Sequence, residues 1–166
     1  FFRWAARMRF IDRSPMDMMR SPKATPARNI LTPAEMSALL EQKMDDDVRA
    51  LVLLGGFAGL RTIEVSRMEW EDIDGKTQQI HVRPEVSKQH EGMLERIVDF
   101  TAPITKRKKF FVGKKGKIVK GSLEALYERR RKVALALGWE AWPDNALRHS
   151  FATYHLAKCE IGRAHV

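Results

Sequence analysis

The sequence has only one cysteine, Cys159, among its 166 residues. A lone cysteine cannot form an internal disulfide, which excludes a disulfide-stabilised secreted scaffold and agrees with a reducing cytoplasm, where we expect the protein to be located. The five histidines are scattered and have no metal-ligand spacing with Cys159 or with one another. We therefore predict neither a metal site nor a cofactor.

Long hydrophobic runs are also missing. The apolar stretch at residues 50–58 is shorter than a membrane span and is interrupted by two glycines. The first ten residues contain three arginines, which a signal peptide would not place in its apolar region. We predict no membrane segment and no signal peptide. Because the sequence begins with Phe1 and not with Met, we expect the native N-terminus to lie upstream.

Acidic residues are outnumbered by basic ones, 21 against 30, which gives a net charge of +9. The excess is concentrated between Lys106 and Lys132, where twelve Lys and Arg residues accompany only Glu124 and Glu128. This balance favours a polyanionic partner. A solvated basic surface is the alternative explanation of the same run, and charge alone does not distinguish DNA from RNA or from an acidic membrane.

Breaker residues divide the chain near Asn29. Residues 1–9 have the spacing of a helix end, and residues 14–26 contain three Xaa-Pro pairs in a basic context, which predicts an extended linker. The length of the remainder suits one globular domain. We predict a terminal piece with linker at 1–29 and a domain at 30–160.

Most of this domain has helical patterns. Thr32-Pro33-Ala34-Glu35 is a capping box that begins a helix, acidic residues 45–47 begin a central apolar helix ended by Gly59, and Thr62 begins another. Further helices are predicted at residues 103–111, 123–137 and 145–158, with Asp144 as the N-cap of the last. Residues 79–83 and 94–100 alternate polar and apolar side chains and predict two antiparallel strands. The expected fold is mainly α with a small antiparallel sheet (α+β).

Two arginines stand at helix junctions. Arg61 lies between two apolar helices, where its planar fork of donors suits a phosphate, although pairing with Glu64 alone would also explain it. Arg148 lies one helical turn after Asn145, and both could be ordinary surface groups. Lys88, between the two predicted strands, is either a solvated lysine or a mobile cation delivered to a phosphate.

In this order the segments resemble the catalytic domain of tyrosine recombinases, the phage-integrase family. Residues 59–65 (Gly-Leu-Arg-Thr-Ile-Glu-Val) match its first-arginine box, and residues 146–153 (Ala-Leu-Arg-His-Ser-Phe-Ala-Thr) match its second-arginine box. Ser87-Lys88 followed by Arg96-Ile97-Val98 matches the hairpin with the catalytic lysine.

The resemblance covers about residues 31–158, and residues 1–29 resemble the tail of the core-binding domain that precedes the catalytic one. It implies DNA strand cleavage and rejoining for site-specific recombination or integration, without a metal, on double-stranded DNA. It also implies that the full-length protein assembles with other protomers on DNA.

By the same resemblance, a Tyr hydroxyl attacks the scissile phosphate and forms a phosphotyrosyl link. Arg61 and Arg148 would bind the non-bridging oxygens, and Lys88 would protonate the leaving sugar oxygen. Glu64 would orient the surroundings of Arg61, and His149 would be a hydrogen-bonding residue beside the site.

The sequence departs from the family at two places. Asn145 stands where the family has a His; its amide can donate to a phosphate oxygen but cannot exchange a proton near neutral pH. The family's nucleophilic Tyr lies beyond the second-arginine helix, whereas this chain has only Tyr127 and Tyr154, both expected to pack locally. We therefore assign no nucleophile and predict that this polypeptide does not cleave DNA.

Residues 161–166 match the translation of ATC GGA AGA GCA CAC GTC, the start of a widely used sequencing adapter whose next triplet is a stop codon. We expect this segment to be an adapter artefact and the catalytic domain to be truncated after Glu160. The competing hypothesis is a non-catalytic basic DNA- or RNA-binding module, and a structural protein is a third possibility. Convergence of Arg61 and Arg148 in one cleft within reach of Lys88 favours the recombinase.

Overall fold

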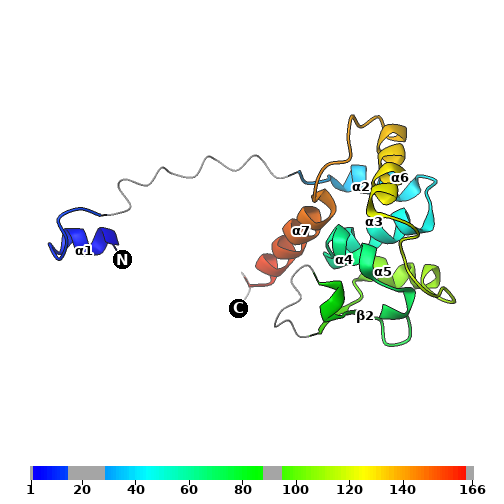
Figure 1. The fold of residues 1–166 in the computed structure, drawn as a ribbon, viewed down its shortest axis with the longest axis horizontal. Coiled ribbons are helices and arrows are strands. Elements are labelled where there is room, and N and C mark those ends of the chain that lie inside the picture. Colours follow the sequence, from blue (N-terminus) through cyan, green and yellow to red (C-terminus); the bar gives the residue numbers. More distant parts are fainter. Residues whose placement is uncertain (1, 15–28, 88–94, 164–166) are drawn as a thin grey trace.

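The computed structural model describes residues 2–14, 29–87 and 95–163 and has the mainly helical architecture with a small antiparallel sheet that the sequence predicts (Figure 1). Three short 3-10 turns lie at Trp70–Asp72, Pro84–Val86 and Lys108–Phe110. The helices are α1 (Phe2–Arg7), α2 (Pro33–Glu41), α3 (Asp46–Ala58), α4 (Thr62–Arg67), α5 (Ala102–Lys106), α6 (Leu123–Ala136) and α7 (Ala146–Arg163), and the strands are β1 (Ile73–Asp74), β2 (Gln79–Val82) and β3 (Arg96–Asp99).

Helix α3 is the centre of the structure, as its apolar sequence predicts. It is contacted by α4, α5, α6 and α7, and Val48, Leu51 and Leu54 are almost fully buried. A Cβ placed on Gly55 would lie 3.2 Å from the Cβ of Leu147 in α7. The small residues of α3 therefore let α7 approach its backbone closely.

The N-terminus of α2 is built as the sequence predicts. The Thr32 side chain accepts a hydrogen bond from the backbone N–H of Glu35, whose carboxylate accepts from the Thr32 N–H at 2.7 Å. The preceding residue, Leu31, is attached to α7: its N–H donates to Ser150 Oγ (2.8 Å), and its carbonyl accepts from the Tyr154 hydroxyl (3.0 Å). The segment that precedes α2 is thus bonded to α7.

The sheet has the order β1-β2-β3, with antiparallel pairs throughout. Strands β2 and β3 are the two predicted strands, in a register that places Val82 opposite Arg96. Strand β1 was not predicted, because two residues are too few for an alternation pattern. Ile80 and Val82 of β2 are buried, whereas most of β3 is exposed. The sheet therefore packs on the core through its middle strand.

Helix α7 corrects the predicted boundaries. It begins at Ala146 and not at Asn145, because Asn145 has a left-handed backbone (φ 54°), and Asp144 therefore does not cap it. The helix also extends beyond Lys158 to Arg163, which includes residues 161–163 of the predicted adapter segment. Lys88, residues 15–28 and residues 164–166 lie outside the described residues. Across the part of the chain that is described, no helix is long and apolar enough to span a membrane.

Candidate phosphate-binding site

Arg61 stands at the junction of α3 and α4. Gly59 ends α3 in the left-handed conformation (φ 69°), and the chain turns so that Arg61 precedes the first residue of α4. Its backbone N–H donates to Glu64 Oε2 at 2.8 Å, and its Nη1 donates to Glu64 Oε1 at 3.0 Å. One carboxylate thus fixes both the backbone and the side chain of Arg61.

The Glu64 side chain is only 1% exposed, although it is charged. Its Oε2 also accepts from Nη2 of Arg96, at 3.3 Å, so that it holds two arginines. Burial alone would raise the pKa of this carboxyl. Hydrogen bonds from the backbone and side chain of Arg61, with the charges of Arg96 and Arg61, outweigh burial and hold the pKa below its ordinary value of 4.5.

Arg148, in the first turn of α7, is partly buried and donates from Nη1 to the carbonyl of Gly59. Burial lowers the pKa of its guanidinium, and the positive charge of nearby Arg61 lowers it further. Arg96 acts in the same direction, whereas Glu64 opposes the shift. Three arginines therefore lie close enough to repel one another around a single carboxylate, which leaves an excess of positive charge.

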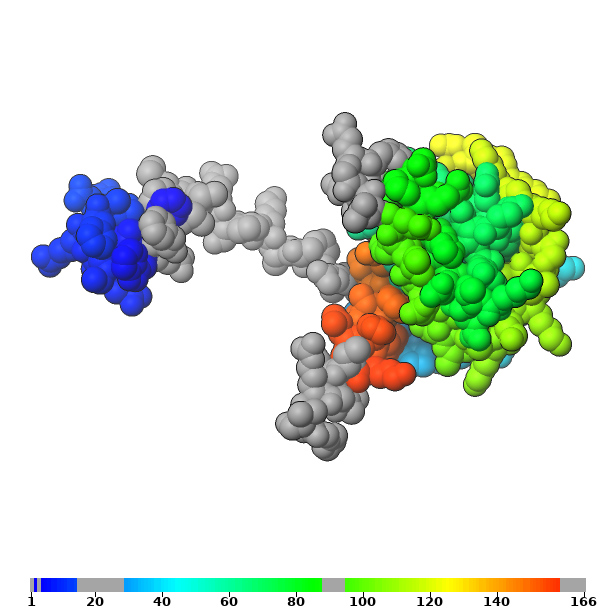
Figure 2. Space-filling model, turned by 90° about the horizontal axis from the view of Figure 1, so that it is seen from below, coloured from blue at the N-terminus to red at the C-terminus, as the bar shows by residue number. Residues whose placement is uncertain are grey.

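A pocket joins these elements. Arg61, Asn145 and Arg148 line it together, and Leu51, Leu60 and Trp142 contribute apolar wall. Figure 2 shows the α7 segment beside the sheet segment on one face of the molecule. The structure thus brings three of the predicted site residues together, on a donor-rich surface suited to an anion.

Two predicted site residues, Asn145 and His149, lie at the start of α7. Asn145 is exposed, with the left-handed backbone that Asn tolerates better than most residues, and its carbonyl accepts from the His149 N–H at 2.9 Å. The buried Nδ1 of His149 has no hydrogen-bond partner among the described residues. The hydrogen-bonding role predicted for His149 stays a prediction.

No protein-family model matches the sequence, and no curated protein sequence matches it. Solved structures match its fold. The integrase from mycobacterium phage Brujita has a TM-score of 0.61 and 19% identity over 92% of this chain and 53% of that chain. XerA recombinase has a TM-score of 0.61 and 20% identity, covering 92% and 57%. The Tn1549 transposon integrase, in complex with circular intermediate DNA, has a TM-score of 0.52 and 20% identity, covering 95% and 62%.

The fold is that of a tyrosine-recombinase catalytic domain. The chain spans little more than half the length of the integrase and XerA chains. In this recombinase-like domain, the arginine pocket lies where α3 gives way to α4 and α7 begins.

The predicted catalytic lysine, Lys88, lies outside the described residues. The chain is described up to Ser87, whose carbonyl accepts from Nη1 of Arg67 in α4 at 2.8 Å. Helix α4 therefore holds the chain immediately before Lys88, while Arg61 at its N-terminus lines the pocket.

Arg96 was not among the predicted site residues. Its signal in the sequence was its place in Arg96-Ile97-Val98, the part of the second predicted strand that matches the family's hairpin. Pairing with Glu64, 32 residues earlier, is a tertiary contact that no local pattern encodes.

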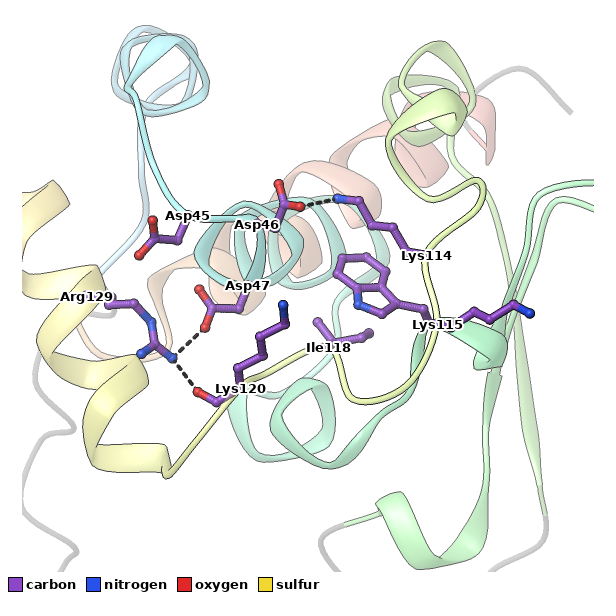
Figure 3. Close-up of a pocket in the computed structure, with 9 residues that line it drawn as sticks. Asp45, Asp46, Asp47, Lys114, Lys115, Ile118, Lys120 and Arg129 are labelled. Carbon is purple, nitrogen blue, oxygen red and sulfur yellow. Dashed lines mark hydrogen bonds and ion pairs between the residues drawn. The ribbon is translucent and has the colours of Figure 1, made fainter.

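The basic region between Lys106 and Lys132 is partly neutralised within the recombinase-like domain. Figure 3 shows a second pocket, at the start of α3, where Lys114 pairs with Asp46 (2.7 Å) and Arg129 pairs with Asp47 (2.5 Å), while the Lys115 side chain points away from these ion pairs. Arg130 and Arg131 also pair with acids. The exposed remainder of the basic region consists of Lys106, Arg107, Lys108, Lys109, Lys115, Lys117, Lys120 and Lys132.

Both tyrosines have local contacts. The Tyr154 hydroxyl donates to the carbonyl of Leu31, and the guanidinium carbon of Arg130 lies 4.1 Å from the ring centroid of Tyr127. Neither tyrosine lines the arginine pocket. In the described part of the chain, no three His, Cys, Asp or Glu side chains gather in a group that could hold a metal ion.

Proposed function

We propose that this chain is the arginine-bearing part of a site-specific DNA recombinase that breaks and rejoins DNA strands. The observation that carries the proposal is the shared pocket of Arg61 and Arg148, fixed by buried Glu64 and the Gly59 carbonyl, on a tyrosine-recombinase fold. Nucleic-acid binding alone needs surface charge, but it does not need arginines held in a pocket around a buried carboxylate. The Tn1549 integrase of similar fold was solved with DNA, which supports duplex DNA as the partner.

The proposed chemistry assigns each residue one task. Arg61 and Arg148 bind the non-bridging oxygens of the scissile phosphate and stabilise the charge that develops in the transition state. Asn145 donates a hydrogen bond from its amide. Lys88 gives a proton to the sugar oxygen that leaves when a Tyr hydroxyl attacks phosphorus, and rejoining reverses the step.

Neither Tyr127 nor Tyr154 is proposed as that nucleophile, because their contacts hold them elsewhere. We therefore propose that this polypeptide binds DNA without forming a covalent DNA intermediate, and that the complete recombinase assembles with other protomers. The exposed basic residues between Lys106 and Lys132 support the alternative function, a non-catalytic nucleic-acid-binding module.

Duplex binding across salt concentrations distinguishes the two functions. We expect Arg61→Ala and Arg148→Ala each to weaken binding of a fluorescein-labelled duplex about 10-fold, because each removes charge-assisted phosphate contacts. Each should also reduce the slope of log affinity against log salt by about 0.9. Arg83→Ala is the matched control, because Arg83 also pairs with acids but lies outside both the pocket and the basic region. If only substitutions in the basic region weaken binding, the recombinase proposal is wrong and the binding-module function stands.

A further inference from the structure

A third arginine reaches the same carboxylate as Arg61. Arg96 comes from β3, whereas Arg61 precedes α4 and Arg148 lies on α7. Glu64 Oε2 accepts from both the Arg61 backbone (2.8 Å) and Arg96 Nη2 (3.3 Å). Two separate elements thus bring guanidinium groups into contact with one buried side chain, and the nearby guanidinium of Arg148 donates to the Gly59 carbonyl.

The charges of this cluster do not balance. Three guanidinium groups carry three positive charges against the single negative charge of Glu64, and no other acid pairs with these arginines among the described residues. Like charges held at short range repel one another, and a bound anion relieves that repulsion. The net positive charge of the cluster therefore favours binding of an anion such as a phosphate group.

Arg96 is well placed to take part of that charge. Its side chain is 45% exposed, and one nitrogen, Nη2, makes the bond to Glu64. A guanidinium has five N–H donors in a rigid plane, so the bond to Glu64 orients the group and occupies only part of its donors. Arg96 is therefore held by Glu64 through one nitrogen while its side chain stays partly exposed to solvent.

We infer that Arg96 donates to a backbone phosphate of the bound DNA strand, as a third arginine of the site. This inference rests on the proposed function of the Arg61 and Arg148 pocket. It assigns Arg96 a direct contact with DNA in addition to its contact with Glu64.

The test is a double-mutant cycle of Arg96 and Arg61 substitutions. Binding of a labelled DNA duplex is measured by fluorescence anisotropy at several salt concentrations. We expect Arg96→Gln to weaken binding about 10-fold and to lower the salt slope by about 0.9, and to do so again in the Arg61→Ala background. Arg83→Gln is the matched control, since Arg83 is also a partly exposed arginine (40%) that pairs with acids, and it lies outside the basic region. It should leave affinity and slope nearly unchanged.

If Arg96 acts only by orienting Glu64 and Arg61, Arg96→Gln has no further effect once Arg61 is gone, and the inference is wrong. Arg96→Lys guards against loss of folding: it keeps the charge, so the slope should persist while affinity falls several-fold. An unchanged affinity in both Arg96 variants also overturns the inference, and the proposed function survives as long as Arg61→Ala and Arg148→Ala still weaken binding. If those two variants bind normally as well, the proposed function itself is wrong.

Discussion

At the scale of single residues, Gly59 and Glu64 determine where the arginines of the pocket lie. Gly59 has a positive φ, contacts the Phe151 ring, and offers its carbonyl to Arg148. Glu64 binds Arg61 and Arg96 from a buried position. Neither residue lines the pocket, but each fixes the position of a guanidinium group.

Gly59→Ala should therefore be costly. A Cβ at Gly59 would lie 2.4 Å from Phe151 Cδ1, and the backbone has φ 69°. Left-handed strain and overpacking together predict a loss of about 2–4 kcal/mol in the free energy of unfolding. Gly113→Ala is the matched control: φ is 79° there, nothing lies within 4 Å, and about 1 kcal/mol of strain is expected. Urea denaturation measures both, and equal losses would show that contact with Phe151 is unimportant.

At the scale of elements, two ion pairs connect the start of α3 to the basic region. Asp46 pairs with Lys114, which precedes α6, and Asp47 pairs with Arg129 in α6. The Asp47–Arg129 pair is nearly buried, with side chains 7% and 24% exposed, whereas Asp46 in the pair with Lys114 is 65% exposed (Figure 3). Lys114 also lies over the rings of Trp70 and Phe110. The two ion pairs therefore connect α3 to the same basic region, but the Asp47–Arg129 pair is more buried than the Asp46–Lys114 pair.

This difference in depth predicts unequal effects of substitution. Asp47→Asn should cost about 2–3 kcal/mol in the free energy of unfolding, because it leaves Arg129 without its counter-charge in a mostly buried position. Asp46→Asn should cost less than about 1 kcal/mol, since a solvated pair contributes little. Urea denaturation at neutral pH compares them. A larger loss for Asp46→Asn would contradict the assignment of α3–α6 attachment to Asp47.

Local chemistry explains which elements the sequence could predict. The capping box at Thr32 and the glycine that ends α3 depend on neighbours in the chain, and both are confirmed. Strand β1 is only two residues long and exists because it pairs with β2, so no local pattern predicted it. The left-handed Asn145 and the Glu64–Arg96 pair depend on tertiary packing, so sequence patterns predicted neither. The shared pocket of Arg61 and Arg148 was expected only from the resemblance to tyrosine recombinases, because a position beside a helix end does not show which residues converge.

At the scale of the whole molecule, the charge is distributed in two ways. Part of the excess of basic residues is bound in internal ion pairs, and part is exposed to solvent. Among the acidic residues, several carboxylates accept hydrogen bonds in the folded state, and these bonds lower their pKa values. These residues are Glu35, Glu64, Glu71, Asp74 and Glu124.

These shifts predict a stability that falls in acid. A carboxyl whose pKa is lower in the folded state binds protons more readily when unfolded, so its contribution is complete above the unfolded pKa. That contribution is lost as pH falls through the folded pKa. We expect the free energy of unfolding, measured by urea denaturation, to be nearly flat from about pH 8 to about pH 6 and to decline from about pH 5 to about pH 3.

Glu64 should supply a distinct part of this decline, because it is the buried member of the group. Glu64→Gln should lower stability by about 1–3 kcal/mol at neutral pH, since a neutral amide replaces a carboxylate bound to two arginines. The same variant should lose less on acidification than the wild-type chain, because the group that would be protonated is gone. Glu140→Gln, at an exposed position, should keep the wild-type pH dependence. If Glu64→Gln keeps the full acid decline, the lowered pKa of Glu64 does not contribute to folding stability.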